Sequence, residues 1–247
     1  MKSRKSEKSD IIGMISAVPL EGDLLVKKLK LLKKSISGQP EAYRCRAFGH
    51  SLVYLISGIG KTNAAHSATV LIKKYRSSII INFGIGGAYL SGGLCIGDIV
   101  VATKEIYADE GINLKDGFHS LETIGIPFLR IGGRKLFNEF PLDRSLSQTA
   151  FSSIRRLFNV KKGIFSTVST CTGTEKRARE LAERFRTICE NMEGAAVAHI
   201  CCLYGIPCVE IRGISNIVEK RDTTKWDIGL AAENCQKAVM AFLAELS

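Results

Sequence analysis

The stretch TNAAHSATVLIKKYRSSIIINFGIGG, residues 62–87, decides the fold. Thr62–Tyr75 carries apolar residues at helical spacing, and Ile79–Asn82 is a short apolar run typical of a buried strand. The glycine-rich segment Gly84–Gly87 follows at once. A helix that leads into a buried strand is typical of α/β proteins. Glycines at the end of such a strand let the backbone approach a small ligand closely.

Strands and helices alternate along the rest of the chain in the same way. Apolar runs predict strands at Ile11–Ala17, Tyr43–Phe48, Leu52–Ile56, Ile96–Thr103, Gly163–Val168 and Pro207–Ile214, with a hairpin turn at Gly49-His50. Amphipathic spacing predicts helices at Leu20–Leu32, Glu175–Arg186, Gly194–Tyr204 and Asp227–Leu246, the last with Asp227 as its N-cap. We therefore predict an α/β fold, a single three-layer domain in which helices flank a mixed, largely parallel central sheet.

Composition limits the class of protein further. The chain has 247 residues and is 45% hydrophobic, which excludes intrinsic disorder of the whole chain. Residues 1–10 are polar and charged, so we expect a disordered tail there and one domain over 11–247. The apolar run Ile11–Leu20 is shorter than the ~20 residues of a membrane span, so no membrane partner is expected. The 8 cysteines lack zinc-site spacing, which favours free thiols in the cytoplasm and no metal.

The net charge of +11 first suggests a nucleic-acid partner. The chain has 35 basic residues, and their excess is diffuse: it includes scattered doublets, such as Lys27-Lys28 and Arg155-Arg156, without interleaved aromatic residues. We therefore expect a solvated basic surface and no nucleic-acid partner.

Two phosphate-binding motifs are incomplete. The segment SGIGKT at 57–62 lacks the first glycine of a P-loop, because Leu55 stands there. The segment at Gly84–Gly87 lacks the third glycine of a dinucleotide fingerprint, because Tyr89 stands there. Neither segment predicts a nucleotide cofactor.

Polar residues gather where the predicted strands end. In an open α/β sheet, ligands bind at the carboxyl ends of the strands. There the sequence places Glu21, the Gly84–Gly87 segment, Glu190–Gly194 and Arg212–Asn216. Glu21 alone could be a first-turn helix carboxylate, and Glu193 alone could be a stabilising charge at a helix N-terminus. Their convergence on one edge favours a site.

Five stretches carry a family resemblance: SAVPLEGDLL (16–25), SGIGKTNAA (57–65), INFGIGGAYLSGGLCIGDIVVATKEIYAD (81–109), ENMEGAAVAHICCLYGIP (190–207) and EIRGISNIVEKRDTTKW (210–226). In this order they resemble the nucleoside phosphorylase superfamily, in its methylthioadenosine/adenosylhomocysteine nucleosidase branch. The last stretch is similar to that of the futalosine-cleaving members. The resemblance implies an N-glycosyl hydrolase that releases hypoxanthine from futalosine in menaquinone biosynthesis, without a cofactor.

The resemblance also implies roles for individual residues. Glu21 matches the glutamate that activates water, and Glu193 matches the carboxylate that binds the ribose hydroxyls. Met192 matches a residue that packs on the sugar, and Ser215 supports the leaving-group residue at position 216. The remaining substrate-binding residues that it implies are Gly84, Ile85, Gly86, Thr172 and Arg212. Arg212 also supports the residue at position 216. The other contacts to the base within Phe165–Thr174 stay open.

Asn216 departs from the methylthioadenosine branch, which has an aspartate at this position. An asparagine cannot deliver a proton, but its amide N–H can bond N7 or O6 of a purine. It therefore favours a hypoxanthine base over adenine, although aminodeoxyfutalosine and methylthioadenosine stay open as alternatives. A protein that binds a nucleoside or nucleic acid without catalysis is a further alternative.

The first loop also bears on the nucleophile. The segment Val18–Asp23 contains two carboxylates, which would repel phosphate, so water is the expected nucleophile. The resemblance implies a homodimer in which a neighbouring subunit completes the site, and Gly111–Pro127, with Phe118 and His119, is our candidate for that loop. We expect His119 to face solvent rather than to act in catalysis.

Overall fold

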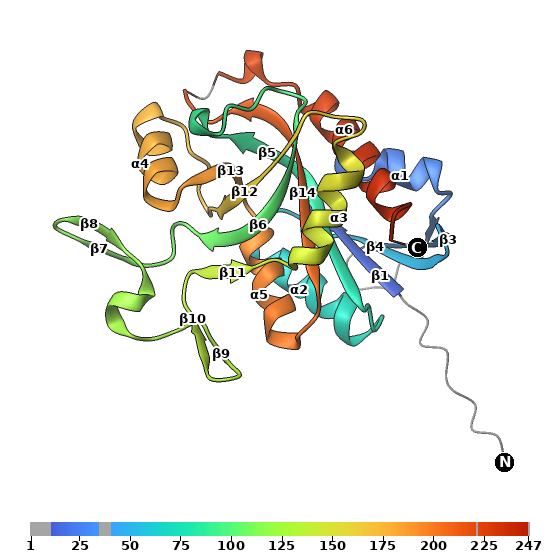
Figure 1. Cartoon of the computed structure of the whole chain (residues 1–247), viewed down its shortest axis with the longest axis horizontal. Coiled ribbons are helices and arrows are strands. Elements are labelled where there is room, and N and C mark those ends of the chain that lie inside the picture. Colours follow the sequence, from blue (N-terminus) through green and yellow to red (C-terminus); the bar gives the residue numbers. More distant parts are fainter. Residues whose placement is uncertain (1–10, 35–40, 221, 247) are drawn as a thin grey trace.

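The computed structural model describes residues 11–34, 41–220 and 222–246 (Figure 1). The predicted tail, residues 1–10, lies outside this part of the chain. The strands are β1 (Ile11–Ser16), β2 (Leu32–Lys33), β3 (Glu41–Ala47), β4 (His50–Ile56), β5 (Ile79–Ala88), β6 (Ile99–Tyr107), β7 (Ile112–Leu114), β8 (Gly117–His119), β9 (Leu129–Ile131), β10 (Arg134–Leu136), β11 (Glu139–Pro141), β12 (Val160–Thr167), β13 (Thr187–Asn191) and β14 (Cys208–Ile217). The helices are α1 (Asp23–Lys28), α2 (Lys61–Lys73), α3 (Arg144–Ile154), α4 (Glu175–Phe185), α5 (Gly194–Tyr204) and α6 (Ile228–Leu243), with 3-10 turns η1 (Pro19–Glu21), η2 (Leu90–Gly92), η3 (Leu121–Ile124) and η4 (Thr223–Lys225).

A mixed sheet of ten strands, counted over the described residues, organises the fold. Its order is β11-β6-β12-β13-β5-β1-β4-β3-β2, and β14 pairs with both β5 and β6. The pairs β5–β14, β14–β6, β6–β12, β12–β13 and β13–β5 therefore close a ring. The first half of β5 pairs with β1, whereas its last residues, Gly87 and Ala88, pair with β13. Because β5 changes neighbours, the sheet splits at its carboxyl end.

Helices cover both faces of the sheet, which confirms the predicted three layers (Figure 1). Helices α2 and α5 contribute to one core cluster, and α1, α3 and α6 contribute to the other. Residues of β5 alternate between these clusters: Ile80 belongs to the first, and Ile81 and Phe83 belong to the second. A continuous apolar run suits this strand because both of its faces are buried.

The first helix is shorter than predicted. The sequence predicts a helix over Leu20–Leu32, but α1 ends at Lys28. Lys30 adopts a left-handed backbone with φ 51°, and the N–H of Leu31 donates to the carbonyl oxygen of Val26 at 3.0 Å. These are features of a Schellman cap, which terminates a helix. Leu32 instead opens β2 with an exposed side chain.

The β3–β4 hairpin turns one residue earlier than predicted. Phe48 and Gly49 have φ of 52° and 79°, and His50 already belongs to β4. Two successive positive φ values are typical of the type I′ turn, which matches the twist of a hairpin. A phenylalanine rarely adopts such a φ, so the sequence pointed to Gly49-His50 instead.

Near the point where the sheet splits, two strands are longer than predicted and a third strand is not predicted. The predicted strands at 79–82 and 207–214 continue to Ala88 and Ile217. The glycine segment and the Arg212–Asn216 segment therefore lie within strands and not after them. β13 was not predicted, because its buried residues include Glu190 and Asn191, which interrupt any apolar run.

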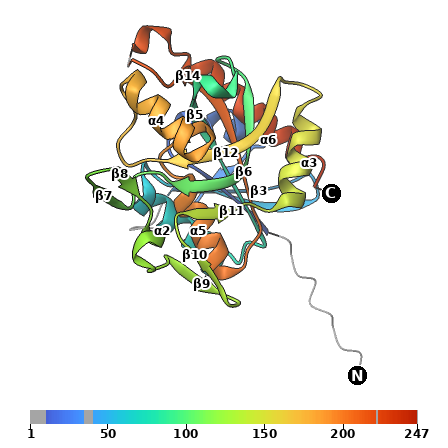
Figure 2. The same cartoon turned by 60° about the vertical axis from the view of Figure 1, so that its left-hand side comes forward.

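An arm projects from the layers between β6 and α3. It contains the β7–β8 hairpin, η3 and the β9–β10 hairpin (Figures 1 and 2). His119 lies in this arm, partly exposed, and its Nε2 is 2.9 Å from Oδ1 of Asp116. The arm also exposes Leu114, Ile124 and Ile126.

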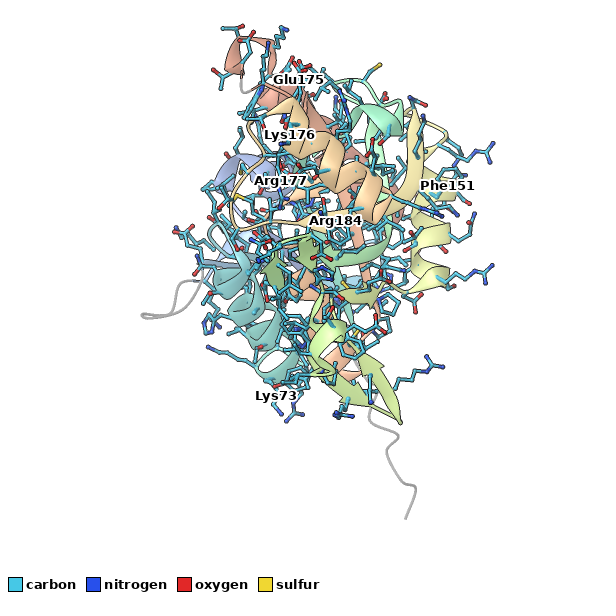
Figure 3. The ribbon with its side chains drawn as sticks, turned by 90° about the vertical axis from the view of Figure 1, so that its left-hand side faces the viewer. Lys73, Phe151, Glu175, Lys176, Arg177 and Arg184 are labelled. Carbon is cyan, nitrogen blue, oxygen red and sulfur yellow. The ribbon has the colours of Figure 1, made fainter. Side chains whose placement is uncertain are left out.

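Basic side chains are spread over separate elements, as their spacing in the sequence predicts. Lys73 lies at the end of α2, well away from Lys176 and Arg184 on α4 (Figure 3). Some are locally neutralised, as in the 3.5 Å ion pair between Arg177 and Glu180. Across 11–34, 41–220 and 222–246, no helix combines the length and apolar character needed to cross a membrane.

All eight cysteines are free thiols. Four are buried: Cys189, Cys201, Cys208 and Cys235. Cys95 and Cys171 are exposed.

Candidate active site

A cavity of about 210 Å³ lies where β1, β5, β13 and β14 come together. Most of the residues singled out from the sequence line it: Glu21, Ile85, Gly86, Thr172, Met192, Glu193, Ser215 and Asn216. Gly84 and Arg212 do not line it but lie directly behind Glu21. The predicted convergence on one edge of the sheet therefore occurs in the structure.

Glu21 is held by backbone N–H groups at the end of β1. Its Oε2 accepts from the N–H groups of Ala17 at 2.8 Å and Val18 at 3.1 Å, and its Oε1 accepts from that of Ile85 at 2.8 Å. Its side chain is buried, and burial raises the pKa of the carboxyl, although Arg212 and the backbone N–H groups oppose this shift. A fixed carboxylate with a raised pKa suits a general base near neutral pH.

Gly84 leaves the space that Glu21 occupies. A Cβ atom on Gly84 would lie 2.4 Å from Oε1 of Glu21 and 2.9 Å from Nη1 of Arg212. No side chain fits at this position without displacing one of these two groups. Gly84 thus contributes to the site by its lack of a side chain.

Arg212 is a buried cation among carboxylates. Its Nε donates to Oε1 of Glu210 at 2.9 Å, its Nη1 donates to the carbonyl oxygen of Ile85 at 3.2 Å, and Nη1 is 3.6 Å from Oε2 of Glu193. Burial disfavours its charge, but Glu210, Glu193 and Glu21 outweigh that effect and raise its pKa. The expectation that Arg212 supports position 216 is not met by these contacts, which go to the carboxylates.

Glu193 occupies the N-cap position of α5 without capping it. Its side chain makes no hydrogen bond to the first turn of α5, and its Oε1 instead accepts from the N–H of Gly60 at 2.9 Å. Its N–H donates to Oδ1 of Asn191 at 2.9 Å. Glu193 therefore places its charge at the N-terminus of α5, as the alternative states, and its side chain also binds the loop before α2 through Gly60. It is a buried carboxylate on the cavity wall, beside Met192.

Ser215 and Asn216 lie at an irregularity of β14. The register with β5 shifts between Ile214 and Asn216, so Ser215 is an extra residue in the strand. A bulge of this kind redirects the side chains around it. The Ser215 hydroxyl donates to Oδ1 of Asn216 at 2.8 Å, and Nδ2 of Asn216 donates to the carbonyl oxygen of Ile217 at 3.1 Å. One N–H of the Asn216 amide remains for a ligand.

A second layer of buried polar residues lies beneath these residues, and no sequence pattern predicts it. Asn191 donates from Nδ2 to Oε1 of Glu105 at 2.6 Å, and Thr167 donates from Oγ1 to Oε2 of Glu105 at 2.7 Å. Burial and the nearby Glu210 hold the pKa of Glu105 well above its usual range. A protonated Glu105 can donate to Oε2 of Glu210, which has no other hydrogen-bond partner among the described residues.

Other cavity residues also went unassigned from the sequence. Glu190 lines the cavity and accepts from the N–H of Thr172 at 2.9 Å. Cys171 lines it with its Sγ 3.3 Å from Sδ of Met192, and Trp226 follows η4 at its rim. The sequence places Glu190 at the same edge of the sheet as Glu21, as part of the segment Glu190–Gly194, but assigns it no role.

The site holds two buried carboxylates, Glu21 and Glu193, at the split edge of the mixed sheet, and hydrogen-bond donors surround them. Such an arrangement is suited to stabilising a cationic sugar. The family model of the Phosphorylase superfamily matches residues 11–245. The chain therefore belongs to the Phosphorylase superfamily, as the resemblance of the five sequence stretches implies.

Within this superfamily, the chain is similar to nucleoside hydrolases. The chain is 35% identical over 224 residues to the futalosine hydrolase of Thermus thermophilus. The aligned region covers 90% of this chain and 95% of that protein. It is 25% identical over 240 residues to the 5′-methylthioadenosine/S-adenosylhomocysteine nucleosidase of a Geobacillus species, covering 95% of this chain and 98% of that protein. The solved nucleosidase of Neisseria meningitidis, in complex with methylthio-immucillin-A, shares the fold with a TM-score of 0.83 at 24% identity, over 95% and 99% of the two chains.

Proposed function

We propose that this protein hydrolyses the N-ribosidic bond of futalosine and releases hypoxanthine, a reaction of menaquinone biosynthesis. The observation that carries the proposal is the position of Glu21, which three backbone N–H groups fix in one cavity with Glu193 and Asn216. The identity of 35% to a futalosine hydrolase supports the choice of substrate.

The proposed mechanism assigns one task to each of these side chains. Cleavage of an N-ribosidic bond passes through an oxocarbenium-like state, as glycoside hydrolysis does. Glu21 orients a water molecule and takes its proton, and Glu193 accepts hydrogen bonds from the ribose hydroxyls. Both carboxylates stabilise the positive charge that develops on the sugar. Asn216 donates its free N–H to the departing base, with its orientation fixed by the Ser215 hydroxyl.

Water, and not phosphate, is the proposed nucleophile. The segment that follows β1 holds Glu21 and Asp23, and in the described residues Arg212 is buried behind Glu21 instead of lining the cavity. Phosphate would therefore meet carboxylate oxygen without a cation on the cavity wall beside Glu21. The expected product is the free sugar.

The test is a comparison of kcat/KM for futalosine, aminodeoxyfutalosine and methylthioadenosine, with and without phosphate. We expect futalosine to be cleaved most efficiently, at a rate that phosphate does not change. A preference for methylthioadenosine would favour the adenine-releasing alternative, and a phosphate-dependent rate with formation of a sugar 1-phosphate would contradict hydrolysis. Release of no base from any of the three would favour a non-catalytic binding protein.

Asn216→Asp is expected to shift the base preference toward adenine. A carboxylate would face O6 of hypoxanthine as acceptor against acceptor, whereas it can accept from the amino group of adenine. We expect the ratio of kcat/KM for aminodeoxyfutalosine over futalosine to rise by about tenfold, since one polar mismatch costs about 1–3 kcal/mol. Asn234→Asp, on α6 outside the cavity, is the charge-matched control. An unchanged ratio in Asn216→Asp would remove Asn216 as a selector.

We also propose that the protein acts as a homodimer in which the arm of one subunit contacts the other. The exposed apolar residues of the arm, Leu114, Ile124 and Ile126, support this proposal, because a monomer gains nothing by leaving them in water. Light scattering is expected to give twice the mass of the chain. Ile126→Glu should increase the monomer fraction, and a monomeric wild type would contradict the proposal.

A further inference from the structure

One buried charge on the cavity wall takes no part in the proposed mechanism. Glu190 lies on β13, is 8% exposed and lines the cavity opposite β14. Burial of a carboxylate costs free energy unless hydrogen bonds compensate it, so the position of Glu190 calls for an explanation.

Glu190 is oriented as a hydrogen-bond acceptor. Its Oε2 accepts from the hydroxyl of Tyr89 at 2.7 Å and from Oγ1 of Thr172 at 2.5 Å. Its Oε1 accepts only from the backbone N–H of Thr172, at 2.9 Å. A carboxylate has about four acceptor positions, and these contacts use three. Oε1 therefore keeps an acceptor position for a ligand that carries an N–H group.

Glu190 and Asn216 flank the same residue of the sheet floor. Gly87 of β5 pairs with Glu190 of β13 on one side and with Asn216 of β14 on the other. Two strand spacings separate the flanking backbones, about 10 Å. A Cβ atom on Gly87 would lie 3.2 Å from Nδ2 of Asn216 and 2.6 Å from a methyl group of Val218. The lack of a side chain at Gly87 thus lets Asn216 and Val218 pack against the strand, and Gly87, Glu190 and Asn216 line the same cavity.

This pair of groups distinguishes the two common purines. From N7 through position 6 to N1, hypoxanthine presents an acceptor, an acceptor and a donor, whereas adenine presents an acceptor, a donor and an acceptor. With Asn216 donating to N7, hypoxanthine offers its N1–H to Glu190. Adenine in the same orientation brings the lone pair of N1 against the carboxylate, which is repulsive.

We propose that Glu190 selects a 6-oxopurine base by accepting its N1–H, and that Thr172 is a positioning residue that holds Glu190 in place. The inference rests on the proposed function, because it concerns the base that this site releases. Glu190 supplies the hydrogen-bond acceptor on the side of the base opposite Asn216.

The test is the variant Glu190→Gln, measured with futalosine and with aminodeoxyfutalosine, which differ in the base. The glutamine oxygen can still accept from the hydroxyls of Tyr89 and Thr172. Its amide nitrogen then replaces Oε1, gives up the hydrogen bond from the Thr172 N–H, and can turn an N–H toward N1 of adenine. We expect the kcat/KM ratio of futalosine over aminodeoxyfutalosine to fall by about 100-fold, because a site built to hydrogen-bond one group rejects an analogue strongly.

Two controls separate selection from a structural effect. Tyr89→Phe removes one hydrogen bond to Glu190 but keeps the carboxylate, so its ratio should change by less than about threefold. Thr172→Val should lower the ratio by about tenfold, and Thr172→Ser should restore it, because serine keeps the hydroxyl. A Glu190→Gln ratio no different from that of Tyr89→Phe would overturn the assignment.

A binding measurement distinguishes failure of this inference from failure of the proposed function. Calorimetry with free hypoxanthine and free adenine needs no turnover, and Glu190→Gln should lower the hypoxanthine preference by about tenfold or more. If the wild-type protein does not cleave futalosine, the proposed function is overturned. The ratio of hypoxanthine affinity to adenine affinity, compared between the wild type and Glu190→Gln, then tests the role of Glu190 by itself. Wild-type protein that cleaves futalosine, together with unchanged ratios in Glu190→Gln, overturns only this inference.

Discussion

Glu21→Gln is expected to lower kcat by about 10²- to 10⁴-fold, the usual contribution of a general base. Glutamine has nearly the same size, and its oxygen can accept from the N–H groups of Ala17 and Val18, whereas its amide nitrogen then faces the N–H of Ile85 without a hydrogen bond. It cannot take a proton from water. Measurement of kcat under substrate saturation, with circular dichroism to verify the fold, tests this expectation.

The pH dependence gives a second test of the same residue. Because burial raises the pKa of Glu21, the base becomes protonated at a higher pH than an exposed glutamate. The activity of the wild type should therefore fall on the acid side at a pH above about 4.3, the value of an unperturbed glutamate. In Glu21→Gln this acid limb should be absent from the residual activity.

A matched variant separates loss of the base from loss of charge. Asp23→Asn removes a carboxylate two residues away, on α1 and outside the cavity lining. We expect this variant to keep kcat within about threefold of the wild type. Equal losses in both variants, or a Glu21→Gln variant with full activity, would contradict the role of Glu21 as general base.

The sequence predicts the layers because their signals are local. The alternation of apolar runs with amphipathic segments locates β1, β5, α2, α5 and α6, and the N-cap at Asp227 is confirmed by its 2.8 Å bond from the N–H of Leu230. The end of α1 is different, because Lys30 takes a left-handed backbone that no local pattern marks. Closure of the ring between β13 and β5 depends on contacts distant in sequence, which periodicity does not encode.

The site is predicted in part for a related reason. Glu21, Glu193 and Asn216 follow recognisable segments, and the structure brings them to one cavity. Glu190 also belongs to such a segment, but its role depends on Thr172, which comes from a loop, and Glu105 has no marker because its partner Asn191 comes from another strand. The resemblance also misplaced the contacts of Arg212, since a motif identifies a residue but not the groups it contacts.

Arg212→Met is expected to destabilise the fold by about 3–5 kcal/mol, the usual cost of removing one partner from a buried ion pair. Methionine fills much of the volume of the side chain, so the loss is one of charge. Glu210 loses its 2.9 Å bond from Nε, and Glu193 loses its counter-ion. For a chain of this size the melting temperature should fall by about 6–20 °C, at about 2–4 °C per kcal/mol.

The loss should depend on pH in a defined direction. Without Arg212, the carboxyl of Glu21 loses the cation that lowers its pKa, so its pKa in the folded state rises further above that in the unfolded chain. The folded variant then binds more protons than the unfolded chain, and its stability falls as pH rises above about 4.3. Thermal unfolding at pH 5 and pH 8 should give the larger deficit at pH 8.

Glu105→Gln is the control that separates loss of the Arg212 charge from a general effect of substitution at a buried polar site. Burial and Glu210 raise the pKa of Glu105, which favours its neutral form, and a glutamine amide can replace a donation from that form to Oε2 of Glu210. We expect a melting temperature close to that of the wild type at pH 8, although the site is equally buried. A deficit in Arg212→Met that is small, or equal at both pH values, would mean that Arg212 does not balance the carboxylates. If instead the predicted pattern is found, the Arg212 guanidinium is what allows the carboxylates of Glu21, Glu193 and Glu210 to be buried beside one another, an arrangement that catalysis by two carboxylates requires.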